Sequence, residues 1–360
     1  MFEFASVWCL NTDRRLPAWS QMTGYRKTAR LPASQASGGS VSLVTMPPPT
    51  LQQLHEDFMA DCRYSARLSS ATLQNYQATF ELLIKVMPSV GLESLTSETL
   101  TSFFRELETR QRMVGHGRVK EGVKASTIAT YRAKLNPFFK WLKHKRHIAA
   151  SPFDNMPHPK VVYEDPKYLH QGEIKKILTA VGFSIHWSTL FVRKRNLAII
   201  VLLLYTGLRK SELVNIELHD LDLARCELRV NAATSKSKCH KTLPINPEVH
   251  RRLADYLEER RKLRSSVPHL FVSETGSAPF TENGLKRMIG RVSKESGVRF
   301  HVHQLRHTFA VNLINSGSDI SVVQKLLGHK GLNSTLTYLR CIPSKTLHRS
   351  VATLSLDTLV

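Results

Sequence analysis

The side chains best suited to chemistry lie near the C-terminus, at His303, Arg306, His329 and Tyr338. His303 and Arg306 are three positions apart, so a helix would present both on one face. A guanidinium is a planar donor for phosphate oxygens, an imidazole moves protons near neutral pH, and a tyrosine hydroxyl can act as a nucleophile. Together these groups could cleave a phosphodiester by covalent attack.

The surrounding sequence predicts two helices that would position these residues. One helix is expected to carry His303 and Arg306, and a second is expected over about 320–327. Gly328 would end this second helix, because glycine tolerates the left-handed turn at a helix C-terminus. His329 follows immediately. The first helix carries apolar residues at helical spacing and is therefore predicted to be packed: Leu305, Phe309, Leu313 and Ile314.

Each of these residues also has an ordinary structural interpretation. A single histidine on a packed helix is usually a satisfied core residue. His303 and His307 are spaced for zinc, but no glutamate follows His303, so the zinc-protease pattern is absent. Arg209 follows a Gly break after an apolar helix, where a partly buried guanidinium is costly without an anion. That position favours phosphate binding, with an ion pair to Glu212 as the alternative for Arg209 alone.

Read together and in order, these motifs resemble the catalytic signature of the tyrosine recombinases, the phage integrase family. The resemblance covers about residues 50–345 and rests on these segments: Thr206-Gly207-Leu208-Arg209-Lys210-Ser211-Glu212-Leu213, His303-Gln304-Leu305-Arg306-His307-Thr308-Phe309, Leu326-Leu327-Gly328-His329 and Tyr338. It implies a site-specific recombinase that cleaves and rejoins double-stranded DNA through a 3′-phosphotyrosyl intermediate and a Holliday junction.

The resemblance also implies a role for each residue of the set. Tyr338 is the expected nucleophile, and Arg209 and Arg306 are expected to bind the phosphoryl oxygens where charge develops. His303 is the expected base or orienting group, and His329 is expected to hydrogen-bond the phosphate. Because the phosphotyrosine conserves the bond energy, religation needs no ATP, and the chain carries no P-loop pattern.

A lysine on a β-hairpin completes the expected catalytic set. From Leu228 the apolar residues alternate, which predicts a short hairpin with a lysine-rich tip. In the family, a lysine on such a hairpin reaches the scissile site and is the candidate general acid. Lys236 matches that position best and Lys238 second. The family usually has glycines where this chain has Ser235 and Ser237, so the choice between the two lysines stays open.

Composition predicts a polyanionic partner. The chain of 360 residues contains 51 Lys and Arg against 29 Asp and Glu, a net charge of +22. Charge alone does not separate DNA from RNA, so a general RNA binder is the alternative on this evidence. Five distant cysteines show no CxxC pair, which indicates reduced thiols in a cytosolic protein. No carboxylate cluster suits two metals, so neither metal nor cofactor is expected. The longest apolar run, 197–205, is too short to cross a bilayer.

The chain is expected to contain two DNA-binding domains. Residues 1–45 are rich in Pro, Ser, Gly and Gln and are predicted to be a disordered or misassigned extension, with Met46 a plausible true start. Four prolines mark the linker. The predicted order after the extension is a helical core-binding domain at 50–150, the linker at 151–167, a catalytic domain at 168–342, and a C-terminal tail at 343–360.

The first domain is predicted to be helical throughout, with four helices. Ser69 or Ser70 can cap the second, Thr96 or Ser97 the third and Ser126 the fourth. The fourth helix is expected to carry an apolar stripe: Ile128, Tyr131, Leu135, Phe138, Phe139 and Leu142. One flank of that helix would form a cationic ridge of four residues: Arg132, Asn136, Lys140 and Lys143. In so basic a chain the ridge is expected to contact DNA phosphates, although a solvated face is the alternative. The tail has a rough amphipathic pattern and is expected to dock on a neighbouring subunit, or else to pack within its own chain.

The expected fold is mainly α with a small β-hairpin (α+β), closing on DNA as a C-shaped clamp. The resemblance implies a homo-tetramer on specific DNA sites in the bacterial cytoplasm, associated with the nucleoid and assisted by accessory or directionality proteins. It leaves open whether the event is integration of a mobile element, transposition, inversion or dimer resolution. A type IB topoisomerase-like enzyme and a non-catalytic DNA-binding protein of the same fold are the alternatives.

Overall fold

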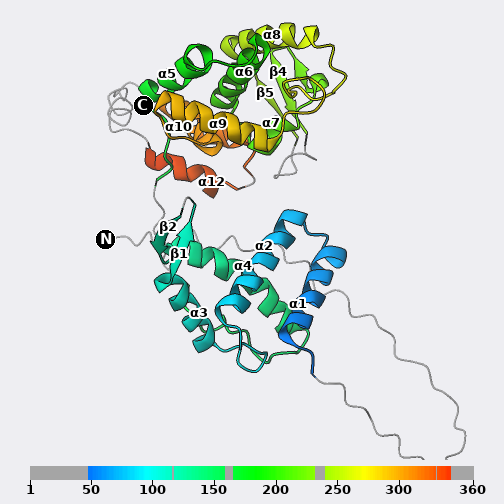
Figure 1. The fold of residues 1–360 in the computed structure, drawn as a ribbon, viewed down its shortest axis with the longest axis vertical. Helices are drawn as coiled ribbons and strands as arrows, with labels where there is room; N and C mark the ends of the chain where they lie inside the picture. The colour runs from blue at the N-terminus through cyan, green and yellow to red at the C-terminus, as the bar shows by residue number, and fades with distance from the viewer. Residues whose placement is uncertain (1–47, 116, 159–164, 232–239, 330, 342–360) are drawn as a thin grey trace, which may run out of the picture. The chain divides into compact units, whose positions relative to one another are not determined.

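The structure is a computed structural model that describes residues 48–115, 117–158, 165–231, 240–329 and 331–341 (Figure 1). The chain divides into two compact units, whose described parts are 48–158 and 165–341. The predicted N-terminal extension at 1–45, Lys236 and Lys238, and the tail at 343–360 lie outside the described residues. Within the described residues, no helix is long and apolar enough to span a membrane.

The first unit is built on four α-helices and a π-helical turn: α1 Leu51–Ala60, the turn Asp61–Ser65, α2 Ser70–Val86, α3 Ser97–Thr109 and α4 Ala125–His144. Ser69 and Thr96 cap α2 and α3 through their side-chain oxygens, which confirms two predicted helix starts. The predicted cap at Ser126 is wrong, because the N-cap of α4 is Lys124, two residues earlier.

An aromatic core holds this unit together. The stripe predicted on α4 is confirmed, since Leu135, Phe138 and Phe139 are buried. Phe138 lies 5.6 Å, centroid to centroid, from Phe80 of α2 and 5.4 Å from Phe58 of α1. Such packing joins α1, α2 and α4 through large buried surfaces.

A two-stranded hairpin in this unit departs from the prediction of helix throughout. Strands β1 Gln111–Val114 and β2 Arg118–Glu121 pair antiparallel, with Met113 opposite Val119. Both of these apolar side chains are mostly exposed. The hairpin therefore lacks the buried face whose alternation would have marked it in the sequence.

In its described residues, the second unit is also mostly helical and contains a three-stranded sheet. Its elements are α5 Gln171–Thr179, a π-helical turn Ala180–Ser184, α6 Leu190–Thr206, α7 Lys210–Val214, a 3-10 turn Leu218–Asp220, β3 Leu221–Asp222, β4 Glu227–Val230, β5 Lys241–Pro244, α8 Pro247–Lys262, α9 Glu282–Ser296, α10 Val302–Asn315, α11 Ile320–Leu327, α12 Asn333–Leu336 and a 3-10 turn Thr337–Cys341.

Helix α6 is the centre of this unit. It is buried along almost its whole length and packs against α8 and α10 (Figure 1). The predicted hairpin is confirmed as β4 and β5, which pair antiparallel with Leu228 opposite Leu243, both buried. Helices α5, α8 and α9 belong to the same unit. The expected mainly helical fold with a small sheet is confirmed.

Candidate active site

Arg306 lies at the centre of the candidate site and is 1% exposed. It projects from α10, and its Nη1 and Nη2 atoms donate to the carbonyl oxygens of Gly207 and Leu327, each at 2.7 Å. Gly207 ends α6 with a φ of 60°, and a Cβ there would lie 2.5 Å from the ring of Phe309. Only glycine fits that turn, so the break before Arg209 is also the acceptor that fixes Arg306.

Arg209 lies beside Arg306, at the N-cap of the short helix α7. Its Nη1 donates to Glu212 Oε1 at 2.7 Å, and its backbone N–H donates to Glu212 Oε2 at 3.0 Å. Its Nη2 approaches the carbonyl of Gly328 at 3.5 Å. The ion pair considered as an alternative for Arg209 is therefore present. It does not exclude phosphate binding, because part of the Arg209 side chain, 21%, remains exposed.

Lys241, which was not identified in the sequence, completes this charged cluster. It begins β5, its side chain is 8% exposed, and its Nζ lies 3.3 Å from Glu212 Oε2. The same Nζ donates to the carbonyl of Leu326 at 3.2 Å. Burial lowers the pKa of Lys241 to about 8, although Glu212 opposes that effect. Burial acts to raise the pKa of Glu212, but Lys241 and Arg209 outweigh it and lower the value to about 2.

The C-terminus of α11 binds all three cations through successive carbonyl groups. The carbonyl of Leu326 accepts from Lys241 and that of Leu327 accepts from Arg306, while the carbonyl of Gly328 is the 3.5 Å partner of Arg209. The last carbonyls of a helix lack intrahelical partners and carry the negative end of its dipole, so cations are favoured there. This helix end therefore sets the spacing of the two predicted phosphate-binding arginines.

The histidines of the site are held in the neutral form. Burial lowers the pKa of His307 to about 4 and that of His329 to about 3, and neighbouring positive charge adds to both effects. His303 is more open to solvent, but partial burial and Arg306 also act to lower its pKa. Its ring packs edge-on against that of His307, with the centroids 4.5 Å apart. Nδ1 of His329 lies 2.8 Å from Oγ1 of the buried Thr335.

Tyr338 reaches this cluster from the last described turn and is 3% exposed. Its hydroxyl lies 3.0 Å from Nδ1 of His307, a contact not foreseen from the sequence. The Tyr338 ring is nearly parallel to that of His329, at 6.5 Å between centroids. Burial raises the pKa of Tyr338, while Arg306 and Arg209 act to lower it. The phenol is therefore protonated and needs an acceptor before it can attack.

The structure brings five of the six predicted catalytic residues into one cluster: Arg209, His303, Arg306, His329 and Tyr338. The sixth, Lys236, lies outside the described residues. Two cations, neutral imidazoles and a phenol suit attack on a phosphodiester, because the cations oppose the charge that develops on its oxygens. In the described part of the chain, no group of three or more His, Cys, Asp or Glu side chains could hold a metal.

The cationic ridge predicted on α4 is only partly present. Arg132 is 6% exposed, and its guanidinium donates to the carbonyls of Pro157 and Met156 at 2.5 and 2.6 Å. It is therefore a buried anchor for the following segment and does not lie on an outer face. Lys140 and Lys143 are exposed, and Lys143 pairs with Asp154 at 2.8 Å. Asn136 is partly exposed.

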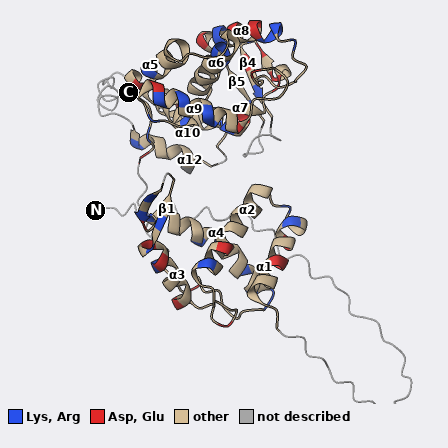
Figure 2. Cartoon of the chain, in the orientation of Figure 1, with Lys and Arg blue, Asp and Glu red and all other residues tan. Residues whose placement is uncertain are grey.

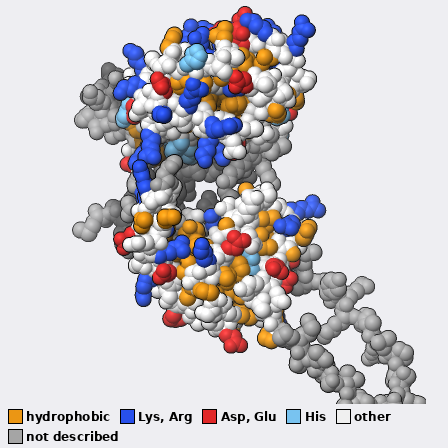
Figure 3. All heavy atoms as spheres, in the orientation of Figure 1, with side chains coloured by type: hydrophobic (Ala, Val, Ile, Leu, Met, Phe, Trp, Pro, Cys, Tyr) orange, Lys and Arg blue, Asp and Glu red, His pale blue; other side chains and the backbone are white. Residues whose placement is uncertain are grey.

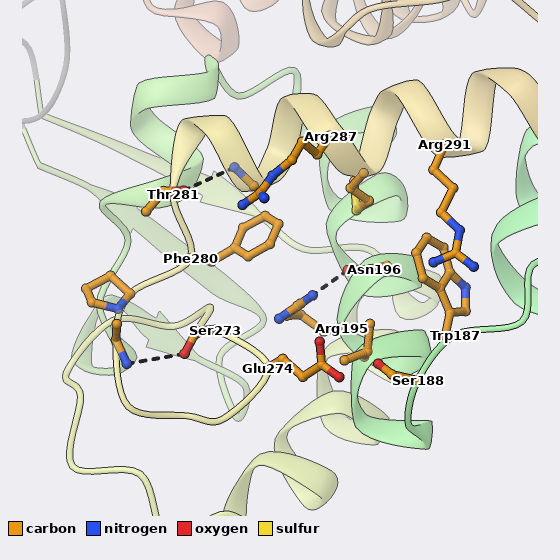
Figure 4. Close-up of a pocket in the computed structure, with 15 residues that line it drawn as sticks. Trp187, Ser188, Arg195, Asn196, Ser273, Glu274, Phe280, Thr281, Arg287 and Arg291 are labelled. Atoms are coloured by element: carbon orange, nitrogen blue, oxygen red, sulfur yellow. Dashed lines mark hydrogen bonds between the residues drawn. The ribbon is translucent and has the colours of Figure 1, made fainter.

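An arginine-lined cavity of about 560 Å³ lies elsewhere in the second unit (Figure 4). The buried Arg195 packs on the ring of Phe280 at 4.5 Å and donates from Nη1 to the carbonyl of Val272 at 2.9 Å. Arg287 and Arg291 project from α9 at the edge of this cavity (Figure 4). None of the five predicted catalytic residues that the structure describes lines it.

Lys and Arg positions are distributed along the elements of both units (Figure 2), and positive side chains are spread over the visible face of each unit (Figure 3). Helix α9 carries an exposed basic set: Lys286, Arg287, Arg291 and Lys294. A distributed positive surface of this kind suits a long polyanion better than a small anionic ligand.

Comparison with protein families covers most of the chain. Residues 167–343 match the model described as "Phage integrase family", and residues 56–146 match "Phage integrase, N-terminal SAM-like domain". A tyrosine recombinase XerC of Escherichia coli O127:H6 is 31% identical over 80% of this chain and 92% of its own length. A tyrosine recombinase XerD of Listeria innocua is 29% identical over 80% of this chain and 94% of its own.

Solved structures show the same fold. The Tn1549 transposon integrase in complex with a circular intermediate DNA matches with a TM-score of 0.66 and 19% identity, over 84% of this chain and 99% of that one. The XerH site-specific recombinase bound to its difH substrate in a post-cleavage complex matches with a TM-score of 0.63 and 21% identity, over 84% of both chains.

Proposed function

Because the chain belongs to the phage integrase family of tyrosine recombinases, and is thus a DNA strand-transferase acting in site-specific recombination, we propose that Tyr338 is its nucleophile. The observation that carries this proposal is the convergence of Tyr338 with Arg209 and Arg306 through the C-terminal end of α11. A scissile phosphate placed between the arginines would lie within reach of the tyrosine hydroxyl.

In the proposed cleavage step, the Tyr338 oxygen forms a bond to phosphorus and the bond from phosphorus to the 5′ oxygen breaks. The hydroxyl proton leaves toward His307, the imidazole already 3.0 Å away, with His303 packed behind it as an orienting group. Arg209 and Arg306 bind the non-bridging oxygens, and His329 donates a hydrogen bond to the phosphate. Lys236, or Lys238 in its place, protonates the departing 5′ oxygen.

The reverse reaction then joins a new strand. A 5′ hydroxyl attacks the 3′-phosphotyrosine, and the phenolate leaves, so no ATP or other cofactor is consumed. Exchange of one strand pair makes a Holliday junction, and exchange of the second pair resolves it. Two DNA sites have four strands to cleave, and a homo-tetramer supplies one Tyr338 for each of them.

We propose that the two units act as DNA-binding domains, at about 50–150 and 168–342, closing on the duplex as a clamp through the linker at 151–167. In the first unit, Asn136, Lys140 and Lys143 are the proposed phosphate contacts, and Arg132 is removed from that set because it is buried. The tail at 343–360 is proposed to dock on a neighbouring subunit. Its deletion should abolish cooperative assembly on DNA while leaving single-site binding intact.

The proposed setting is the bacterial nucleoid, and hence the cytoplasm. Relatives span several kinds of event, since Xer recombinases and a transposon integrase both match. Integration of a mobile element, transposition, inversion and dimer resolution all remain compatible with the proposed chemistry, and accessory or directionality proteins are proposed to bind outside the catalytic cluster. Residues 1–45 are proposed to be dispensable, so a chain starting at Met46 should bind DNA as the full chain does.

A plasmid assay separates the proposed function from its two rivals. Supercoiled plasmids carrying one or two copies of the DNA flanking the gene would be incubated with the enzyme. Recombination predicts deletion or inversion products only with two sites, whereas a topoisomerase-like enzyme would relax both plasmids. A non-catalytic DNA-binding protein would leave both unchanged, and Tyr338→Phe would then have no effect in any assay.

A further inference from the structure

Lys241 occupies a position that the proposed reaction does not use. It is the buried basic residue at the start of β5, and it lies between α7 and the end of α11. Burying an ammonium group is costly unless it is fully paired. Its two described partners, Glu212 and the carbonyl of Leu326, each belong to an element that also contacts an arginine of the site.

Glu212 is the first of these links. Its carboxylate is fully buried and is shared between Arg209, which binds Oε1, and Lys241, which approaches Oε2. Both cations thus draw on the same negative charge. Without Lys241, Arg209 would feel more of the charge of Glu212, which would draw that guanidinium back from a substrate phosphate and weaken its pull on the phosphoryl oxygens.

The end of α11 is the second link. Lys241 donates to the carbonyl of Leu326, two residues before Gly328 and three before His329. The next carbonyl, that of Leu327, accepts from Arg306. Lys241 therefore ties β5 to the helix end that places His329 and spaces both arginines.

We propose that Lys241 is a positioning residue for the proposed strand cleavage, one that keeps Arg209 and His329 aimed at the scissile phosphate without itself touching DNA. This assignment of Lys241 rests on the proposed function. It adds a supporting residue to the candidate active site. The role needs a positive donor at the start of β5, so arginine can replace lysine there, whereas an uncharged side chain cannot.

The test compares Lys241→Met, Lys241→Gln and Lys241→Arg with the wild type on a nicked DNA that yields a covalent adduct. Lys241→Met should form the adduct about 100-fold more slowly, the scale expected when reacting groups are misplaced by about an ångström. DNA affinity should stay unchanged. Lys241→Gln keeps a donor to Leu326 but no charge and should remain slow, while Lys241→Arg should restore most of the rate.

Lys194→Met is the matched control, because Lys194 also pairs with a partly buried carboxylate of the same unit, Glu259 at 2.9 Å. It should cleave within about twofold of the wild type. Equal cleavage by Lys241→Met and the wild type would overturn the assignment, as would unfolding of both uncharged variants, since Lys241 would then hold the fold. Absence of an adduct with the wild type would contradict the proposed function instead.

Discussion

Nδ1 of His307 lies 3.0 Å from the hydroxyl oxygen of Tyr338. Both side chains are mostly withdrawn from solvent, and burial holds the imidazole neutral and the phenol protonated. A neutral imidazole with a free Nδ1 lone pair can accept the phenolic proton directly. The histidine after the arginine of the HQLRH segment is therefore the closest described acceptor for the proposed nucleophile.

Replacing His307 by leucine should slow adduct formation by about 100-fold, since it removes the proposed acceptor of the Tyr338 proton. Asparagine can keep one hydrogen bond to the hydroxyl, so His307→Asn should retain more activity than His307→Leu. Single-turnover cleavage of a nicked substrate measures both rates, and a filter-binding assay shows whether DNA affinity is unchanged. A His307→Leu rate equal to that of the wild type would show that another group accepts the proton.

The two site arginines should differ in their effect on stability. Arg306→Lys loses the fork that binds two backbone carbonyls and should lower the free energy of unfolding by about 1–3 kcal/mol. Arg209→Lys keeps a point charge beside Glu212 in a partly exposed position and should cost about 1 kcal/mol or less. Urea titrations measure both values, and a larger loss for Arg209→Lys would contradict the structural role of Arg306.

Much of the site was predictable because local sequence encodes it. The spacing of His303 and Arg306 on one helix and the Gly328 turn before His329 are local features, and the structure has both. Glu212 and Lys241 are 29 positions apart and meet only when β5 packs beside α7 and α11. No periodicity in the sequence indicates such a contact. The ion pair between Glu212 and Lys241 could therefore not be predicted from the sequence.

The same limit explains the errors in the first unit. The spacing of residues on a helix predicts that Arg132 lies on a cationic ridge. That spacing does not show that residues 156–157 fold back and cover the Arg132 side chain. The β1–β2 hairpin was missed because Met113 is 80% exposed and Val119 is 60% exposed, so alternation there has no buried face. The cap at Ser69 was predictable from the sequence, because its side chain accepts from a backbone N–H only three residues away.

His55 should make the first unit sensitive to acid. Its ring stacks on Phe80 at 3.7 Å, and burial lowers the pKa of His55 from 6.5 to about 4. The folded pKa is depressed, so stability is complete above pH 6.5 and falls as the unfolded chain takes up the proton. Between pH 8 and pH 5 the loss should be about 2 kcal/mol.

A His55→Leu variant tests this effect, because leucine keeps an apolar side chain in the core and removes the titration. Between pH 8 and pH 5, the free energy of unfolding of this variant should fall by about 2 kcal/mol less than that of the wild type. Denaturant titrations on the unit containing α1–α4 within the full chain give the comparison. Parallel pH dependence of the two proteins would place the acid sensitivity elsewhere.

Substitutions at Lys140 and Arg132 should have different effects, one on DNA binding and the other on the stability of the first unit. Lys140→Ala should weaken DNA binding and reduce the slope of log affinity against log salt by about 1, because one phosphate contact is lost. Arg132→Ala should instead destabilise the first unit, since two carbonyls lose a charged donor. Salt-dependent binding and thermal melts distinguish the two outcomes. An unchanged salt slope for Lys140→Ala would remove it from the DNA surface.

Covalent trapping is the most direct test of the assignment of Tyr338 as nucleophile. Wild type and Tyr338→Phe would be incubated with nicked fragments of the DNA flanking the gene, or with a Holliday junction built from it, and resolved on denaturing gels. If Tyr338 is the nucleophile, a protein–DNA adduct forms with the wild type alone, and Tyr338 is recovered in the DNA-linked peptide. An adduct that persists in Tyr338→Phe would contradict this assignment.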